Sequence, residues 1–178
     1  MACRPATLED GPAIARIGVA AWKIGYADIL SPEYLATWRE DDLLARWTRG
    51  FLADPSVLVA ESDGRVVGFS RHGPPRDDDV GAGTGEIISL NVDPAHWRGG
   101  HGAALLTAGV DRLRERGYTR AVLWVLRDNV RGRRFYESQG WRPDGTERRC
   151  ALVPDAIALE VRYERALQVG RPGDRLFV

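Results

Sequence analysis

Several residue types and features are scarce in this chain, and each scarcity excludes a class of protein. Only two residues are cysteines, Cys3 and Cys150, and they form neither a disulfide framework nor a metal-binding motif. No apolar run is long enough to cross a bilayer, and the first residues lack the apolar stretch of a signal peptide. The sequence therefore predicts a cytoplasmic protein without a metal site.

The chain also lacks an excess of charge of either sign, with 25 lysine and arginine residues against 25 aspartates and glutamates. Without a net field, neither nucleic acid nor a membrane surface is an expected partner. The length of 178 residues suits one domain with a substantial core. We predict that this domain spans residues 2–166 and that residues 167–178 form a C-terminal tail.

The most informative segment is residues 92–106, which read VDPAHWRGGHGAALL. An apolar strand at 86–92 runs into a glycine-rich turn and then into an amphipathic helix. Such a turn aims free backbone N–H groups and the positive end of the helix dipole at one point, which makes an anion receptor. Gly99, Gly100 and Gly102 let a bulky anion approach the backbone. The segment therefore predicts a phosphate or pyrophosphate site.

Two familiar phosphate loops fit this segment poorly. A nucleoside-triphosphate loop needs lysine followed by serine or threonine after its last glycine, and this chain has Ala103 and Ala104 there. A dinucleotide loop needs a third glycine where the chain has Leu105, and an acidic residue that the next strand lacks. Neither class of nucleotide is the expected ligand.

The spacing instead resembles the acetyl-CoA loop of the GCN5-related N-acetyltransferase (GNAT) family, Gln/Arg-x-x-Gly-x-Gly/Ala. Gly100 and Gly102 occupy the two glycine positions, and Trp97 departs from the pattern at the Gln/Arg position. Since backbone N–H groups hold the anion, this departure costs little.

A second segment, residues 129–141, supports the same resemblance. It reads NVRGRRFYESQGW and resembles the family element Asn-x-x-Ala-x-x-x-Tyr-x-x-x-Gly-Phe. Gly132 replaces the alanine and Trp141 the phenylalanine. The residues agree physically with a helix here, because Asn129 is a good N-cap and Gly140 a good terminator.

The resemblance implies an α/β (α+β) fold of GNAT type. Its sheet is mixed, mostly antiparallel and twisted, with about six to seven strands, helices on both faces and central strands that splay apart. The spacing of apolar residues along the chain agrees with this fold. It predicts helices around 14–22 and at 40–51, 102–116 and 129–139, and strands at 56–61, 66–70, 86–92, 119–126, from 141 onward and at 156–163.

The resemblance also implies acetyl-CoA as cosubstrate, with its pantetheine arm in the opening between the strands at 86–92 and 119–126. The cofactor-binding residues expected from it are Leu90, Asn91, Val92, Trp97, Arg98, Gly99, Gly100, His101, Gly102, Ala103, Asn129, Arg133 and Tyr136.

The implied reaction is direct attack of an amine on the thioester in a ternary complex. Tyr136 matches the family's tyrosine and is the expected general acid for the departing thiolate, although ring packing alone also explains it. Glu86 is the expected general base, directly or through water, because alternation places it on the face of Leu90. A strand-end charge in solvent is its alternative role, and His72 is a weaker candidate base.

The acceptor side is the least defined by sequence. Trp22 and Tyr26 are expected to bind the substrate, since an aromatic wall suits a cationic amine, although core packing explains Trp22 equally well. Residues 77–79 are three aspartates, expected to form a solvated loop. The acceptor is a small-molecule amine or an amine of a peptide or protein.

Two further alternatives stay open. The same fold also serves as a non-catalytic acyl-CoA-binding sensor. The exposed edge strands of this fold can pair with a second copy of the chain, so a homodimer is also expected.

Overall fold

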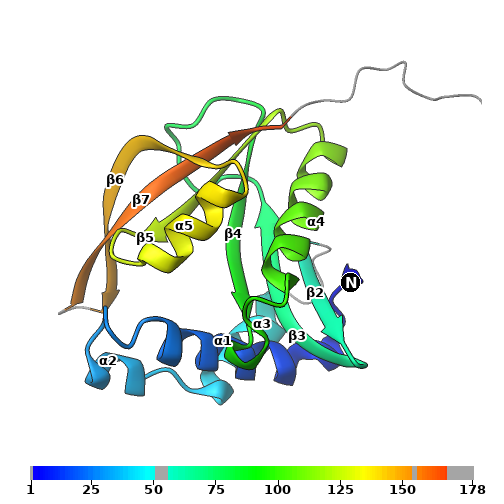
Figure 1. Ribbon diagram of the computed structural model, residues 1–178, viewed down its shortest axis with the longest axis vertical. Helices are drawn as coiled ribbons and strands as arrows, with labels where there is room; N and C mark the ends of the chain where they lie inside the picture. Colours follow the sequence, from blue (N-terminus) through cyan, green and yellow to red (C-terminus); the bar gives the residue numbers. More distant parts are fainter. Residues whose placement is uncertain (1, 51–55, 154–155, 168–178) are drawn as a thin grey trace, which may run out of the picture.

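The computed structural model describes residues 2–50, 56–153 and 156–167, and within them it shows one curved mixed sheet with helices on both faces (Figure 1). The strands run in the order β1-β2-β3-β4-β5-β7-β6, and β4 and β5 alone are parallel neighbours in this described sheet. Its strands are β1 (Cys3–Pro5), β2 (Val57–Ser62), β3 (Arg65–Gly73), β4 (Thr84–Val92), β5 (Arg120–Leu126), β6 (Arg142–Val153) and β7 (Ala156–Ala166). The predicted sheet is confirmed.

Each face of the sheet has its own helices. On one face lie α1 (Gly11–Gly25), α2 (Pro32–Ala36) and α3 (Glu40–Gly50), and on the other lie α4 (His101–Glu115) and α5 (Val130–Ser138). Ile14 and Ile17 of α1 pack with Phe69 of β3 in one core cluster, whereas Leu106 and Val110 of α4 pack with Ile87 of β4 in another. Short 3-10 turns, η1 (Leu8–Asp10) and η2 (Pro94–His96), precede α1 and α4.

The predicted helices and strands are found with shifts of a few residues at their ends. The largest extensions are in β3, which continues to Gly73 instead of ending at 70, and β7, which continues to Ala166. The predicted helix end at Phe51 and the predicted tail from residue 168 onward lie outside the described residues.

The two central strands splay apart, as predicted. β4 and β5 are paired from Thr84 and Arg120 to Glu86 and Val122, and beyond these residues their pairing ends. The C-terminal half of β4 therefore has a free edge that faces the opening toward β5.

A bulge in β4 changes which residues share a face of the sheet. Arg71 of β3 pairs with Ser89, but the next residue, His72, pairs with Ile87, so that Ile88 is an extra residue in β4. Because side chains alternate along a strand, one extra residue reverses the alternation. Leu90 therefore shares a face with Ile87 and not with Glu86.

Candidate active site

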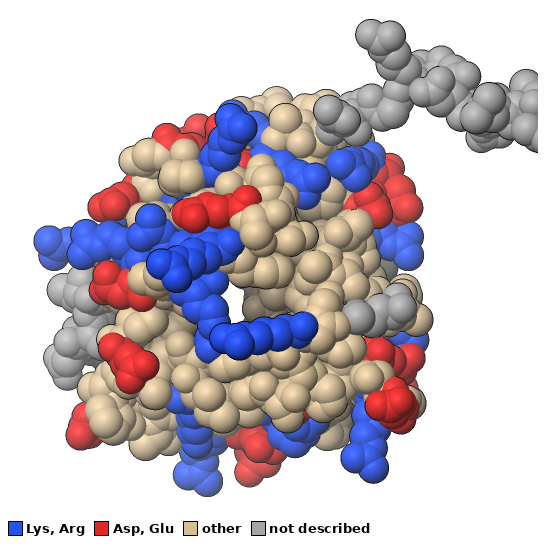
Figure 2. All heavy atoms as spheres, in the orientation of Figure 1, with Lys and Arg blue, Asp and Glu red and all other residues tan. Residues whose placement is uncertain are grey.

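A cavity of about 860 Å³ lies where β4 and β5 diverge. Its walls come from α1, β4, the loop before α4, β5, α5 and β7. Figure 2 shows a hollow in the middle of one face, with basic side chains (Lys or Arg, blue) along part of its rim and with the background visible through it. The hollow is therefore open to solvent from both sides in this view.

Most residues predicted from the sequence line this cavity. They are Trp22, Tyr26, Leu90, Asn91, Val92, Trp97, Arg98, Gly100, His101, Gly102, Ala103, Asn129 and Tyr136. Glu86, Gly99 and Arg133 are not among its lining residues.

The glycine-rich loop presents backbone donors to the cavity. Arg98 and Gly100 have positive φ angles of 64° and 83°, and Gly100 is the N-cap of α4. Among the described residues, the N–H groups of Arg98, Gly100 and residues 101–103 have no backbone acceptor. Together with the helix dipole, these N–H groups form an anion site of the kind that holds a pyrophosphate.

Gly99 and His101 pack against one another in this loop. A Cβ on Gly99 would lie 3.1 Å from the imidazole of His101, so this glycine permits a close contact with a neighbouring ring. The His101 side chain is buried, and its Nδ1 has no hydrogen-bond partner among the described residues. His101 is therefore part of the loop's interior and does not point into solvent.

Trp97 fixes the loop to the end of β4. Its Nε1 donates a hydrogen bond of 2.8 Å to the carbonyl oxygen of Val92. The guanidinium carbon of Arg131 lies 3.7 Å from the centroid of the indole ring, a cation–π contact across the cavity. Trp97 therefore ties the loop to both β4 and α5.

The arginine of α5 that faces the cavity is Arg131, not the predicted Arg133. Arg133 instead donates hydrogen bonds to the hydroxyl of Tyr163 and the carbonyl of Arg127. The cause is helical periodicity: Arg131 shares a face with Phe135, four residues on, whereas Arg133 is turned away from it.

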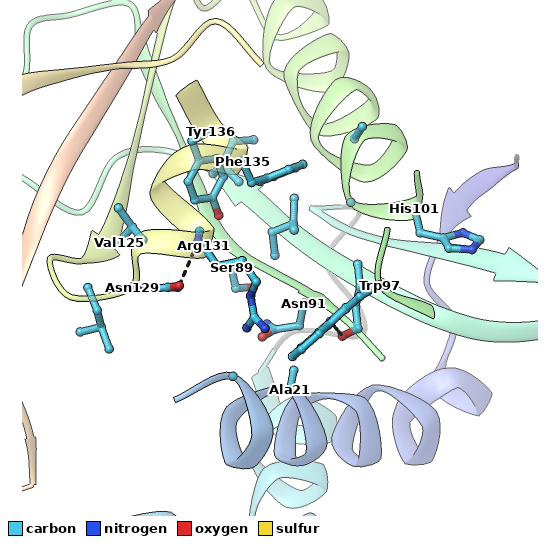
Figure 3. Close-up of a pocket in the computed structure, with 18 of the residues that line it drawn as sticks. Ala21, Ser89, Asn91, Trp97, His101, Val125, Asn129, Arg131, Phe135 and Tyr136 are labelled. Atoms are coloured by element: carbon cyan, nitrogen blue, oxygen red, sulfur yellow. Dashed lines mark hydrogen bonds between the residues drawn. The ribbon is translucent and has the colours of Figure 1, made fainter. Parts of the chain in front are cut away.

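Tyr136 enters the cavity from α5. Asn129 caps this helix, since its Oδ1 accepts a hydrogen bond of 2.9 Å from the N–H of Gly132. The Tyr136 hydroxyl points into the cavity (Figure 3). Burial raises the pKa of this hydroxyl, and the nearby Tyr26 raises it further. It therefore remains protonated at neutral pH and is available as a proton donor.

Tyr26 approaches the same region from α1, on the opposite face of the sheet. Burial raises the pKa of its hydroxyl, the positive charge of Arg131 opposes the rise, and the negative charge of Glu160 adds to it. A hydrogen bond with Asn129 also opposes the rise. Groups from α1, α5 and β7 therefore gather around one point between the splayed strands.

The surroundings of Glu86 do not support its predicted role as the general base. Its carboxylate is fully buried and accepts hydrogen bonds from the backbone N–H of Arg76, at 2.8 Å, and from the Arg76 guanidinium, at 2.6 and 3.0 Å. The bulge at Ile88 places it on the other face from Leu90. Glu86 instead anchors the loop that follows β3.

Of the aspartates at 77–79, Asp78 and Asp79 are exposed as the sequence predicted, whereas the side chain of Asp77 is only 13% exposed. Asp77 accepts a hydrogen bond of 2.6 Å from Nε1 of Trp124 and one of 3.0 Å from Arg148. Asp79 pairs with Arg162 at 2.7 Å. The loop between β3 and β4 is therefore fixed to β5, β6 and β7, behind the cavity wall.

Six polar or aromatic residues of the cavity were not predicted from the sequence: Ser89, His96, Trp124, Phe135, Gln139 and Glu160. The Oγ of Ser89 is buried, with no hydrogen-bond partner among the described residues. Ser89, Trp124 and Glu160 belong to no motif, and they meet only because β4, β5 and β7 converge.

No group of three or more metal-ligating side chains occurs within the described ranges. No helix of those ranges is long and apolar enough to span a membrane. The fold and cavity define a class of protein: an α/β protein with an open cavity between splayed strands and an anion site at a helix N-terminus beside it.

Residues 24–141 match the acetyltransferase (GNAT) family, and the chain belongs to this family. It is an N-acetyltransferase of that family, an acyltransferase enzyme. It is 32% identical over 127 residues to the uncharacterized N-acetyltransferase YuaI of Bacillus subtilis, covering 71% of this chain and 72% of that one. It is 37% identical over 120 residues to the mycothiol acetyltransferase of Sanguibacter keddieii, of which the match covers 38%, against 67% of this chain.

Solved structures have the same fold. The ribosomal-protein-alanine N-acetyltransferase of Brucella melitensis aligns with a TM-score of 0.73 at 24% identity, over 94% of this chain and all of that one. The structure of yncA, a putative acetyltransferase from Salmonella typhimurium with acetyl-CoA, aligns with a TM-score of 0.70 at 26% identity, over 94% of each chain.

Proposed function

We propose that this acetyltransferase moves the acetyl group of acetyl-CoA to a primary amine by direct attack in a ternary complex. The observation that carries the proposal is the position of the Tyr136 hydroxyl. It lies in the same cavity as the free N–H groups of Arg98 and residues 100–103, where the paired part of β4 and β5 ends. A donor for the thiolate and a receptor for the pyrophosphate thus share one space.

The residues present fit acetyl-CoA. The N–H groups of the glycine-rich loop bind the pyrophosphate, and the free edge of β4 at Leu90–Val92 pairs with the amide groups of the pantetheine arm. Arg98 and Arg131 add positive charge on this side of the cavity. Tyr136, which lines the same cavity, would then supply the proton donor for the thioester's sulfur.

In the reaction, the amine nitrogen forms a bond to the acetyl carbon and the carbon–sulfur bond breaks. The electron pair of that bond remains on sulfur, and the Tyr136 hydroxyl donates its proton to the thiolate. An acceptor that arrives as an ammonium first loses one proton to water, because only the neutral amine has the lone pair that attacks. After the attack its nitrogen loses a second proton through water in the cavity, which restores the tyrosine. The products are the acetylated amine and coenzyme A with its free thiol.

The test is Tyr136→Phe, which removes the hydroxyl and keeps the ring. We expect kcat to fall about 100-fold, the lower end of the usual contribution of a general acid, while CoA affinity is unchanged. Thiol release from acetyl-CoA over a panel of amines measures kcat, and calorimetry measures CoA binding. Tyr118→Phe is the matched control, because Tyr118 is partly buried against the core and does not line the cavity.

A non-catalytic sensor would bind acetyl-CoA, release no thiol with any amine and be indifferent to Tyr136→Phe. That result would refute the proposed mechanism. If calorimetry detects no heat with CoA at millimolar concentration, the protein does not bind CoA and the proposed mechanism is refuted.

Three further proposals concern the bounds of the domain, its location in the cell and its oligomeric state. We propose residues 2–166 as the catalytic domain, a cytoplasmic location, and a homodimer formed through an exposed sheet edge. Cell fractionation and sedimentation of the purified protein test the last two.

A further inference from the structure

The cavity has one carboxylate among its described lining residues, that of Glu160 on β7. Its side chain is 15% exposed. Glu160 pairs with Leu126 at the end of β5, on the same face as α2 and the end of α1, because Leu126 packs with Leu30 and Tyr26. It therefore lies away from the glycine-rich loop, on the side left for the acceptor.

The Glu160 carboxylate is held in place with one oxygen engaged. Nε of Arg148 donates a hydrogen bond of 2.7 Å to Oε2, and Arg148 is itself held by Asp77 at 3.0 Å. Among the hydrogen bonds of the described residues, none involves Oε1. A carboxylate has lone pairs on both oxygens, so Oε1 can accept from a ligand while Arg148 fixes the orientation.

The ion pairs behind this wall contain more negative than positive groups. The carboxylates are those of Asp77, Asp79, Glu86, Asp144 and Glu160, and the guanidiniums are those of Arg76, Arg148 and Arg162. Arg131, which also faces the cavity, is stacked on Trp97 beside the glycine-rich loop, and its charge also acts on the hydroxyl of Tyr26. The excess of carboxylates around Glu160 favours a cation at this part of the cavity, whereas the glycine-rich loop favours an anion.

Aromatic rings complete this side of the cavity. Trp22 stacks on Trp38 with centroids 3.8 Å apart and meets the Tyr26 ring edge-on at 4.7 Å. Trp124 is fixed by its hydrogen bond to Asp77, and the Arg148 guanidinium carbon lies 4.0 Å from its ring centroid. Fixed indole and phenol rings attract an ammonium group and cover an apolar body.

We propose that Glu160 binds the ammonium group of the acceptor, and that the acceptor is a cationic primary amine with no carboxylate beside its amino group. A carboxylate on the carbon that bears the amine would approach Glu160 and the acidic cluster and would be repelled. The inference rests on the proposed acetyl transfer and specifies its acceptor.

The test uses amines that differ in one charge. Phenylalaninamide and phenylalanine share a skeleton, and only the second has a carboxylate beside the amine. Spermidine and a peptide that begins with alanine extend the cationic set, and glutamate extends the carboxylated set. We expect the wild-type protein to acetylate the cationic set with the higher kcat/KM.

Glu160→Gln removes the charge and keeps the shape. We expect KM for the cationic amine to rise about 10- to 100-fold, the usual worth of a hydrogen bond to a charged group, with CoA affinity unchanged. Glu160→Asp should restore part of the loss. Glu164→Gln is the matched control on the same strand, since Glu164 pairs with Arg120 and does not line the cavity.

Each outcome decides between the two proposals. Normal KM in Glu160→Gln, or preference of the wild-type protein for the carboxylated amines, would overturn this inference and leave acetyl transfer intact. Failure of the wild-type protein to release thiol with every amine would overturn both. Weaker CoA binding in Glu160→Gln would show a structural role and would also overturn the inference.

Discussion

The two ends of the cavity are built in opposite ways. The end that we assign to the cofactor presents mainly backbone N–H groups from one short segment, those of Arg98 and residues 100–103, and its charge preference comes from a helix N-terminus. The acceptor end consists of side chains from α1, β5 and β7, held by ion pairs to the loop between β3 and β4. One end therefore depends on local backbone geometry, and the other on long-range contacts.

This difference predicts that changes at the acceptor end alter KM for the amine and the stability of the fold, but leave the affinity for CoA unchanged. Asp77→Ala should show the largest effect. It removes the acceptor of the Trp124 indole and the partner of Arg148, and the Asp77 side chain is only 13% exposed. We expect the free energy of unfolding to fall by about 3 kcal/mol, the usual cost of leaving a buried partner unpaired. Urea denaturation measures it.

The same variant should raise KM for the amine, because Arg148 and Trp124 lose their support, and should leave CoA affinity unchanged. Asp78→Ala is the matched control, since Asp78 is the exposed neighbour in the same loop. A drop in CoA affinity in Asp77→Ala would show that the two ends are coupled and would contradict the comparison.

The cofactor end can be broken separately, with a smaller effect on stability. Gly100 and Gly117 lie at the two ends of α4 with φ angles of 83° and 85°. Alanine at either position should cost about 1–2 kcal/mol, because side chains disfavour left-handed backbone. Only Gly100→Ala also disturbs the N–H groups of the loop. We therefore expect CoA to bind about tenfold more weakly to Gly100→Ala, equivalent to about 1.4 kcal/mol, and with unchanged affinity to Gly117→Ala.

Calorimetry with CoA and thermal unfolding of both variants check this prediction. Equal loss of CoA affinity in the two glycine variants would show that general destabilisation, and not the loop, controls cofactor binding.

The same contrast explains how much of the protein could be predicted from its sequence. The order of strands and helices and most of the glycine-rich loop followed from local patterns, because turn glycines, caps and alternation act over a few residues. The Asn129 cap and the inward position of Tyr136 belong to one short helix with a readable motif.

The errors arose where a local pattern was extended too far. Glu86 was placed beside Leu90 by simple alternation, and the single extra residue Ile88 reversed it. Asp77 looked like solvated charge because its partners, Trp124 and Arg148, follow more than 45 residues later in the chain. No local signal connects Glu160 to the cavity either.

The contact between Trp97 and Arg131 gives the smallest expected effect and tests how far the cofactor end relies on side chains. The guanidinium carbon of Arg131 lies 3.7 Å from the Trp97 ring centroid, and it is the clearest side-chain link between the loop and α5. In a double-mutant cycle of Trp97→Leu and Arg131→Met, we expect a coupling energy of about 0.5–1 kcal/mol, typical of a cation–π pair at a partly exposed site. Chemical denaturation of the four proteins measures it.

A coupling near zero would mean that the loop is held by its backbone and by the hydrogen bond from Trp97 to Val92. The cofactor end would then depend almost entirely on main-chain groups.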